Sequence, residues 1–159
     1  KIYLKKNKYF SIGISIYITS LAIGIAVNYP YEYCYYNALA GNHVENRYEL
    51  DYWEVSMKQV LEFISEDAQR DNKAHVSVSA LHHMEMGGLY FNYEALKSSD
   101  KTLLEILYID KTSDYIVINS TYANIYYPEE YNEFRKMFEP CKQITSYDNV
   151  ICEIYKMDY

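Results

Sequence analysis

The stretch from Pro30 to Trp53, PYEYCYYNALAGNHVENRYELDYW, separates a long uncharged segment from the first amphipathic helix pattern of the chain. Its first half is rich in tyrosine, whose amphipathic ring favours the membrane headgroup region because one end is apolar and the other end binds water. Its second half ends in Glu49 to Trp53, where Asp51 is placed to accept backbone N–H bonds at the start of a helix. The stretch therefore predicts a hinge at the membrane surface, over residues 29–53.

An apolar segment precedes this hinge. No charged residue occurs from Tyr9 to Tyr31, and residues 9–27 are long enough to cross a hydrocarbon core as a helix. A signal peptide is the alternative, because lysines precede the run and Gly24-Ile25-Ala26 resembles a cleavage site, but the run is longer than a usual signal-peptide core. We therefore predict that residues 1–28 comprise cytoplasmic lysines and a transmembrane helix.

Small hydroxyl-bearing residues recur along one face of that helix. Ser11, Ser15 and Thr19 are spaced by four residues, and Ser20 and Gly24 form a second pair with the same spacing. Such faces let neighbouring membrane helices approach closely, which is typical of a helix within a bundle. A lone anchor also tolerates small residues, so both arrangements remain open at this point.

The charges are distributed unevenly along the chain of 159 residues. The net charge is −7, and because four lysines lie in the first eight residues, residues 9–159 carry −11. An acidic body of this kind argues against nucleic-acid binding. Lysines before the apolar run and acidic residues after it predict a cytoplasmic N-terminus and an extracytoplasmic domain.

The region after the hinge has the pattern of a small α/β domain. Apolar residues at helical period predict an amphipathic helix from Tyr52 to about Ala68, with Asp51 as its cap and the following residues on its buried stripe: Trp53, Met57, Val60, Leu61, Ile64 and Ala68. Strands are predicted at residues 76–80 and 115–119, and a hairpin is predicted over residues 142–145 and 150–156.

The remaining segments are helical or ambiguous. Residues 84–97 are weakly helical with a break at Gly87-Gly88, residues 103–109 end a helix or form a short strand, and a helix begins at Pro128. Alternating helices and strands predict one domain with a mixed sheet over residues 54–159. The fold class is therefore one N-terminal transmembrane helix followed by a small α/β domain.

Several short motifs resemble one enzyme family. The order P-Y-x-Y-x-Y-Y-N-x-L-A-G, then R-Y-E-L-D-Y-W and a helix, is similar to the segment after the last transmembrane helix in bacterial membrane glycosyltransferases of the dolichyl-phosphate-mannose-protein mannosyltransferase type (glycosyltransferase family 39, GT-C class). The resemblance continues through SDYIVINS (residues 113–120) and VICEIYK (residues 150–156). The chain departs from the pattern at Tyr29, where relatives often have His, and at Gly41-Asn42, where they often have a Gly-Gly pair.

The resemblance implies a function and a set of partners. It implies the C-terminal extracytoplasmic domain of a polytopic enzyme that moves a sugar from a polyprenyl-phosphate carrier to a glycan, lipid or protein acceptor. The catalytic acidic residue of the family lies in an early extracytoplasmic loop, so this portion is expected to be non-catalytic and to hold no cofactor. Its expected partners are membrane lipid and the other helices of the enzyme. The alternative is a single-pass anchored domain that binds a partner outside the cell.

The acidic and aromatic residues around the hinge are the candidate contacts with the acceptor or the membrane domain. They comprise Tyr36, Asn37, Glu49, Asp51, Tyr52 and Trp53. Carboxylates accept hydrogen bonds from sugar hydroxyls and Trp offers a stacking face, but a helix cap and a core position explain Asp51 and Trp53 equally well. Asn37 is expected to bond the loop backbone.

The histidines and cysteines suggest no metal or disulfide site. His82 and His83 are adjacent and diverge on any regular element, so we predict that they are surface residues without a metal. The three cysteines, Cys34, Cys141 and Cys152, are too few and too poorly matched in register for a disulfide scaffold, and we predict free thiols.

Overall fold

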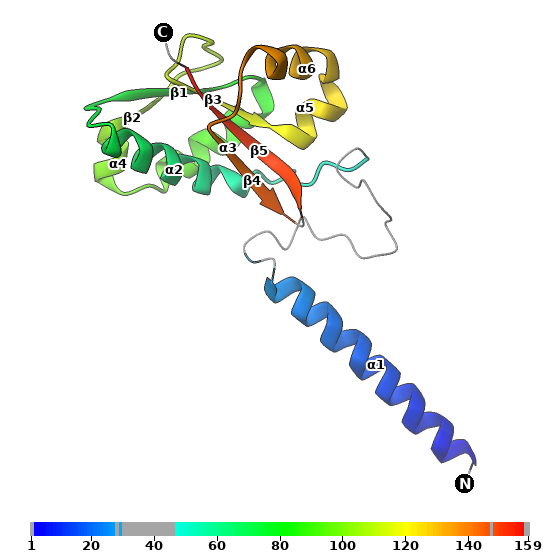
Figure 1. The fold of residues 1–159 in the computed structure, drawn as a ribbon. Helices are drawn as coiled ribbons and strands as arrows, with labels where there is room; N and C mark the ends of the chain where they lie inside the picture. Colours follow the sequence, from blue (N-terminus) through cyan, green and yellow to red (C-terminus); the bar gives the residue numbers. More distant parts are fainter. Residues whose placement is uncertain (1, 28, 30–46, 147, 158–159) are drawn as a thin grey trace.

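The computed structural model describes residues 2–27, 29, 47–146 and 148–157. Tyr36 and Asn37 of the predicted hinge lie outside these residues. The described residues form an N-terminal helix and a small α/β domain with a five-stranded mixed sheet, as predicted (Figure 1).

Helix α1 (Ile2–Val27) is the N-terminal element. Its segment Lys8–Val27 spans 20 residues with a hydropathy of 2.0, so it is long and apolar enough to cross a membrane. Isoleucines at alternate positions between residues 12 and 18 are exposed, which places apolar side chains around the whole helix. The Ser20 hydroxyl donates to the Tyr17 carbonyl oxygen at 2.8 Å, so this polar group is satisfied within the helix itself.

The sheet has the strand order β2-β1-β3-β5-β4. Strand β1 (Val76–Ala80) is parallel to both β2 (Leu104–Ile106) and β3 (Tyr115–Asn119). Strand β5 (Asn149–Lys156) is antiparallel to β3 and to the edge strand β4 (Lys142–Ser146). All of β3 is buried, as predicted for an interior strand.

Strands β4 and β5 form the predicted hairpin, in which Thr145 pairs with Val150. A bulge between Ile144 and Thr145 shifts the register, so Cys152 pairs with Ile144 rather than with Gln143 as the unbulged hairpin predicts. Cys141 and Cys152 are free thiols, as predicted.

Helices cover both faces of the sheet (Figure 1). Helices α2 (Ser56–Arg70) and α3 (His83–Glu94) pack on one face, and α5 (Ser120–Tyr126) and α6 (Pro128–Met137) pack on the other. Helix α4 (Ser98–Leu103) connects α3 to β2. The domain is therefore a three-layer structure with a core on each side of the sheet.

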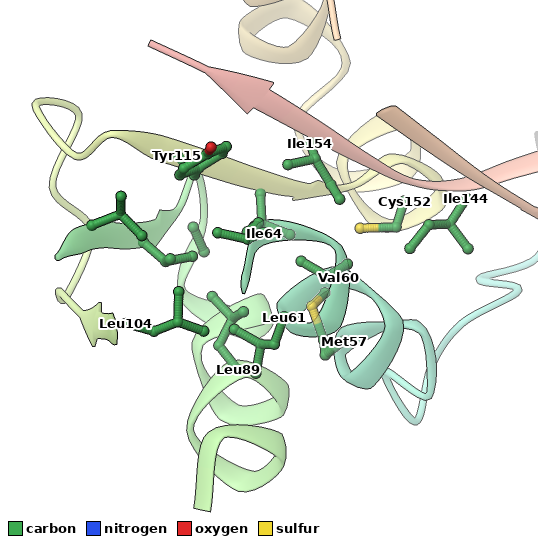
Figure 2. Packing of buried hydrophobic residues seen from close by; sticks show 14 of the residues in the cluster. Met57, Val60, Leu61, Ile64, Leu89, Leu104, Tyr115, Ile144, Cys152 and Ile154 are labelled. Atoms are coloured by element: carbon green, nitrogen blue, oxygen red, sulfur yellow. The ribbon is translucent and has the colours of Figure 1, made fainter. Parts of the chain in front are cut away.

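The larger core lies between α2 and the sheet (Figure 2). The predicted stripe of α2 from Met57 to Ala68 is fully buried. It packs against strand residues that include Tyr115 and Ile154. Each large apolar side chain buried here contributes about 1.5–3 kcal/mol relative to exposure, so this stripe is a main source of stability.

The start of α2 differs from the prediction. The helix begins at Ser56 rather than at Tyr52, and Trp53, predicted to be its first core residue, is 70% exposed. Glu54 has a φ angle of 52°, which a right-handed helix does not accommodate. The backbone conformation at Glu54 therefore keeps Trp53 out of the helix, although the apolar pattern in the sequence extends to that residue.

Two further helices correct the prediction. Helix α3 is continuous through Gly87 and Gly88, where a break was predicted, because its regular hydrogen bonding tolerates glycine at a modest cost. Helix α5 was not predicted, and it directly follows β3 with the Asn119 side chain accepting the Tyr122 N–H at 3.1 Å. This N-cap ends the strand and starts the helix at one residue.

Candidate functional site

The carboxyl ends of β1 and β3 lie side by side in the sheet. The chain leaves β1 toward α3 on one face, and it leaves β3 toward α5 on the other face. In α/β sheets such a divergence of connections is where ligand sites commonly form. The polar residues placed here are His82 and Glu85 after β1, and Asn119 at the end of β3.

The segment of residues 47–55 reaches the same end of the sheet. The Asn119 side-chain amide donates to the Asp51 carbonyl oxygen at 3.2 Å, which joins the segment to β3 across a long sequence separation. This brings together four acidic residues, Glu49, Asp51, Glu54 and Glu85, called here the carboxylate cluster. Burial, with Glu85 and Asp51 nearby, raises the pKa of Glu49.

Asp51 is fixed at the base of α2. Its Oδ1 accepts the Val55 N–H at 2.8 Å, and its Oδ2 accepts the Ser56 N–H at 3.3 Å as well as the Ser56 hydroxyl. The residue is 1% exposed, and burial raises its pKa to about 6 although the bonds from Ser56 and Val55 oppose the rise. Asp51 therefore satisfies N–H groups at the helix start, as predicted, but one turn ahead of the helix.

Glu54 lies against the glycine pair of α3. A Cβ added to Gly88 would lie 2.6 Å from the Glu54 Cβ, whereas one added to Gly87 would have only the Glu54 Oε2, at 3.9 Å. The Glu54 carboxyl group accepts a hydrogen bond from the Gly88 N–H. Burial raises the pKa of Glu54 to about 8, and the neighbouring carboxylates add to the rise. Glu54 therefore carries its proton through most of the neutral range.

Glu85 and His82 form the inner part of the site. Glu85 is fully buried, and its Oε1 accepts the Asn119 N–H at 3.1 Å and lies 3.4 Å from the His82 Nδ1. The His82 ring stacks on Tyr127 with centroids 4.4 Å apart, and its Nε2 lies 3.6 Å from the Glu130 Oε2. The prediction of His82 as a surface residue is wrong, because this stacking and the buried acid enclose the ring.

The other predicted contact residues are placed differently. Tyr52 and Trp53 are 55% and 70% exposed, and their rings meet edge to face with centroids 5.2 Å apart. His83 is exposed, as predicted, and its Nδ1 lies 2.6 Å from the Tyr108 hydroxyl. The 47–55 segment thus directs its acids into the domain and this aromatic pair to the surface.

Hydrogen bonds tie the carboxylate cluster to the rest of the domain. Within the part of the chain that the structure describes, no group of three or more His, Cys, Asp or Glu side chains has metal-binding geometry. The hydrogen bonds of Asp51 and Asn119 join the segment to α2 and β3. These hydrogen bonds hold residues 47–55 in a fixed position against the domain.

A second polar site, which the sequence analysis missed, lies on the α5 and α6 face. Glu153 is completely buried in β5, where its carboxylate accepts the Tyr155 hydroxyl at 2.6 Å, the Tyr131 hydroxyl at 3.0 Å and the Gln143 amide at 2.8 Å. The signal in the sequence is a glutamate in the middle of an otherwise apolar strand, VICEIYK. A pocket of about 260 Å³ opens beside this residue.

Comparisons of the chain with protein-family models, with curated proteins and with solved structures found no match. The sequence motifs, their placement in the structure, the two polar sites and the apolar helix α1 are therefore the observations from which a function is inferred.

Proposed function

We propose that this chain is the C-terminal portion of a polytopic membrane glycosyltransferase, consisting of a spanning helix and a non-catalytic extracytoplasmic domain. The parent enzyme would transfer a sugar from a polyprenyl-phosphate carrier to a glycan, lipid or protein acceptor. The observation that carries the proposal is the division of the R-Y-E-L-D-Y-W motif into a buried part and an exposed aromatic pair. That motif is also part of the sequence resemblance to the glycosyltransferase family.

The buried part of the motif gives the domain a rigid start. Leu50 packs into the main core, and Asp51 bonds the first N–H groups of α2. Residues 50 and 51 are thereby fixed to the domain, so the exposed rings that follow them are presented in a defined position. A surface with a defined position suits a contact with other parts of an enzyme, which supports the proposal.

The exposed part of the motif provides a contact surface. Tyr52 and Trp53 expose adjacent rings, and aromatic residues of this type are favoured both at membrane interfaces and in protein contacts. We propose that this pair contacts the membrane surface or the other helices of the enzyme. Glu49, which is partly buried, lies at the same segment and would contribute a carboxylate to an acceptor.

Helix α1 supports the membrane part of the proposal. Its apolar circumference suits lipid or neighbouring helices, and Ser11, Ser15 and Thr19 fall on one face with the four-residue spacing that permits close helix contact. We place the four N-terminal lysines in the cytoplasm and the acidic domain outside.

The second candidate is a single-pass anchored binding domain. The pocket beside Glu153 favours it, because a preformed polar pocket suits ligand binding without any transferase chemistry.

Paired aromatic substitutions in the parent enzyme distinguish the two candidates. Replacing Tyr52 and Trp53 together by alanine should reduce sugar transfer from a labelled polyprenyl-phosphate donor while the domain stays folded. Tyr90 and Phe91 are also adjacent and exposed, so their double alanine variant is the matched control and should keep activity. Equal activity in both variants, or a coding sequence without further hydrophobic spans upstream, would contradict the proposal.

Protease protection tests the orientation. In sealed inverted vesicles, residues 47–159 should resist added protease until detergent is present, because an extracytoplasmic domain lies inside such vesicles. Rapid digestion of the domain in intact vesicles would place it in the cytoplasm.

A further inference from the structure

The pocket beside Glu153 is formed by three elements. Ser120 and Asn124 come from α5, Arg135 comes from α6, and Asn149 and Glu153 come from β5. These residues bring hydroxyl, amide, guanidinium and carboxylate groups around a volume of about 260 Å³. The pocket lies on the face of the sheet opposite α2 and is separate from the carboxylate cluster.

Glu153 fixes the floor of this pocket. Three hydrogen bonds, from two tyrosine hydroxyls and the Gln143 amide, occupy most of its acceptor positions. The Arg135 Nε lies 3.7 Å from the Glu153 Oε1, and the guanidinium lies over the Tyr131 ring at 5.4 Å from its centroid. Glu153 is therefore a positioning residue, which holds the Arg135 guanidinium at the edge of the pocket.

Ser120 is the observation that points to a ligand. Its Oγ is buried, lines the pocket and makes no hydrogen bond of ordinary length within the described ranges, with the Tyr131 hydroxyl as a weaker neighbour. A buried hydroxyl without a partner costs stability, and native proteins retain few such groups without a reason. A hydroxyl both donates and accepts, so its natural partner is a group that does the same.

The charges of the pocket restrict the ligand. The negative charge of Glu153 is balanced by Arg135, and Asp148 is exposed at the rim. An inorganic anion would meet two carboxylates, and an apolar molecule would leave the Ser120 hydroxyl unbonded. Apart from Val150, the remaining lining side chains carry neutral hydroxyl and amide groups, a chemistry that matches sugar-like hydroxyls.

We propose that this pocket binds one neutral polyhydroxylated molecule of about monosaccharide size, with Ser120 and Arg135 bonding its hydroxyl groups. The pocket is smaller than the range of about 300–1,000 Å³ that accommodates drug-sized ligands, so it suits a single ring. The inference does not depend on the transferase proposal, because it concerns only the residues of this domain.

Ligand-observed NMR on the full chain tests the inference. The chain is held in dodecylphosphocholine micelles, whose head group contains no sugar, and D-glucose, D-mannose, D-galactose and myo-inositol are titrated separately by saturation-transfer difference. Glycine is the zwitterionic comparison probe, because Arg135 and Asp148 could also bind its two charges. At least one polyol should bind saturably in the millimolar range, and glycine should not.

Three variants locate the binding. Ser120→Ala should weaken the affinity about fivefold without loss of stability, and Arg135→Gln should weaken it more than about tenfold, since charged hydrogen bonds are stronger. Ser113→Ala removes another buried, unpartnered hydroxyl at the opposite end of β3, so this control should bind normally.

The outcomes separate cleanly. No saturable binding by any polyol, binding of glycine alone, or equal affinity of the Ser120→Ala variant and the original chain would overturn the inference. If Arg135→Gln disturbs folding, as judged by circular dichroism, the Ser120→Ala variant decides the question by itself. The NMR titration measures binding to this chain without any transferase assay. A negative result for sugar transfer therefore leaves the binding result unaffected.

Discussion

Replacing Glu54 by glutamine tests the electrostatics of the carboxylate cluster. Glu54 is 8% exposed and close to the carboxylates of Asp51 and Glu85. Glutamine keeps the shape of the side chain and an oxygen that accepts the Gly88 N–H, but it removes the charge. The variant therefore isolates the free-energy cost of ionising this buried acid in the folded domain.

The magnitude follows from the pKa of Glu54, which is raised from 4.5 to about 8. The folded domain holds the Glu54 proton more tightly than the unfolded chain, so the contribution of Glu54 to stability is fully present below pH 4.5 and is lost as the pH rises through 8. At roughly 1.4 kcal/mol per pKa unit, the loss is about 3 kcal/mol by pH 7 and about 5 kcal/mol once ionisation is complete. The glutamine variant does not lose this stability, so the difference in unfolding free energy between the variant and the original chain should increase from pH 4.5 to pH 8.

The assay is urea unfolding of the full chain in micelles, followed by near-ultraviolet circular dichroism of the buried tyrosines. At pH 4.5, where little of this cost is present, the two proteins should unfold at similar urea concentrations. At pH 7 the glutamine variant should unfold about 1–3 M higher, given an urea dependence of about 1–3 kcal/mol per molar. Glu66 is exposed on α2, so Glu66→Gln is the control and should change stability by less than about 0.5 kcal/mol.

Two results would refute this reasoning. One is a glutamine variant that is no more stable than the original at pH 8. The other is a stability difference that stays constant with pH, since a packing effect would not follow the titration of Glu54.

Five further substitutions test the start of the domain. Asp51→Ala should destabilise it by about 2 kcal/mol, because buried N–H groups of α2 lose their acceptor, and an unchanged urea midpoint would contradict this role. Gly88→Ala should cost about 1–3 kcal/mol because the added methyl group would overlap with Glu54, whereas Gly87→Ala should be neutral or slightly stabilising. Thermal unfolding compares the two variants, and equal effects would contradict the close contact between Gly88 and Glu54. Met57→Ala should cost about 2–5 kcal/mol by leaving a cavity, while Trp53→Ala should change stability by less than about 0.5 kcal/mol; a large effect of the Trp53 change would place that ring in the core.

The elements with a clear local period could be predicted from the sequence. The apolar stripe of α2 and the buried run of β3 are repeated patterns that neighbouring residues alone reveal. The start of α2 could not be predicted in this way. The left-handed conformation at Glu54 is held by its contact with Gly88 on a different helix, and such a contact leaves no periodic signal in the sequence.

The polar sites were predicted less completely than the fold. Glu49 and Asp51 were singled out as hinge carboxylates that could accept hydrogen bonds from a sugar, but Glu85 and His82 join them only through the packing of α3 against the sheet. Glu153 was missed because its partners Tyr131 and Tyr155 come together in three dimensions. Long-range hydrogen bonds, rather than local sequence, determine which acids a domain buries.

The two edges of the sheet bear on how copies of the protein behave when crowded together. Strand β2 has only three residues, and the pairing of β4 shifts register between Ile144 and Thr145, where β5 contains one extra residue. Edges that are short, or that are twisted by a bulge in the neighbouring strand, are poor templates for strand addition from another molecule, which is a common first step in aggregation. If α1 spans a membrane as proposed, copies of the chain would meet repeatedly in the same orientation, and interrupted edges would allow a high surface density without intermolecular sheet formation.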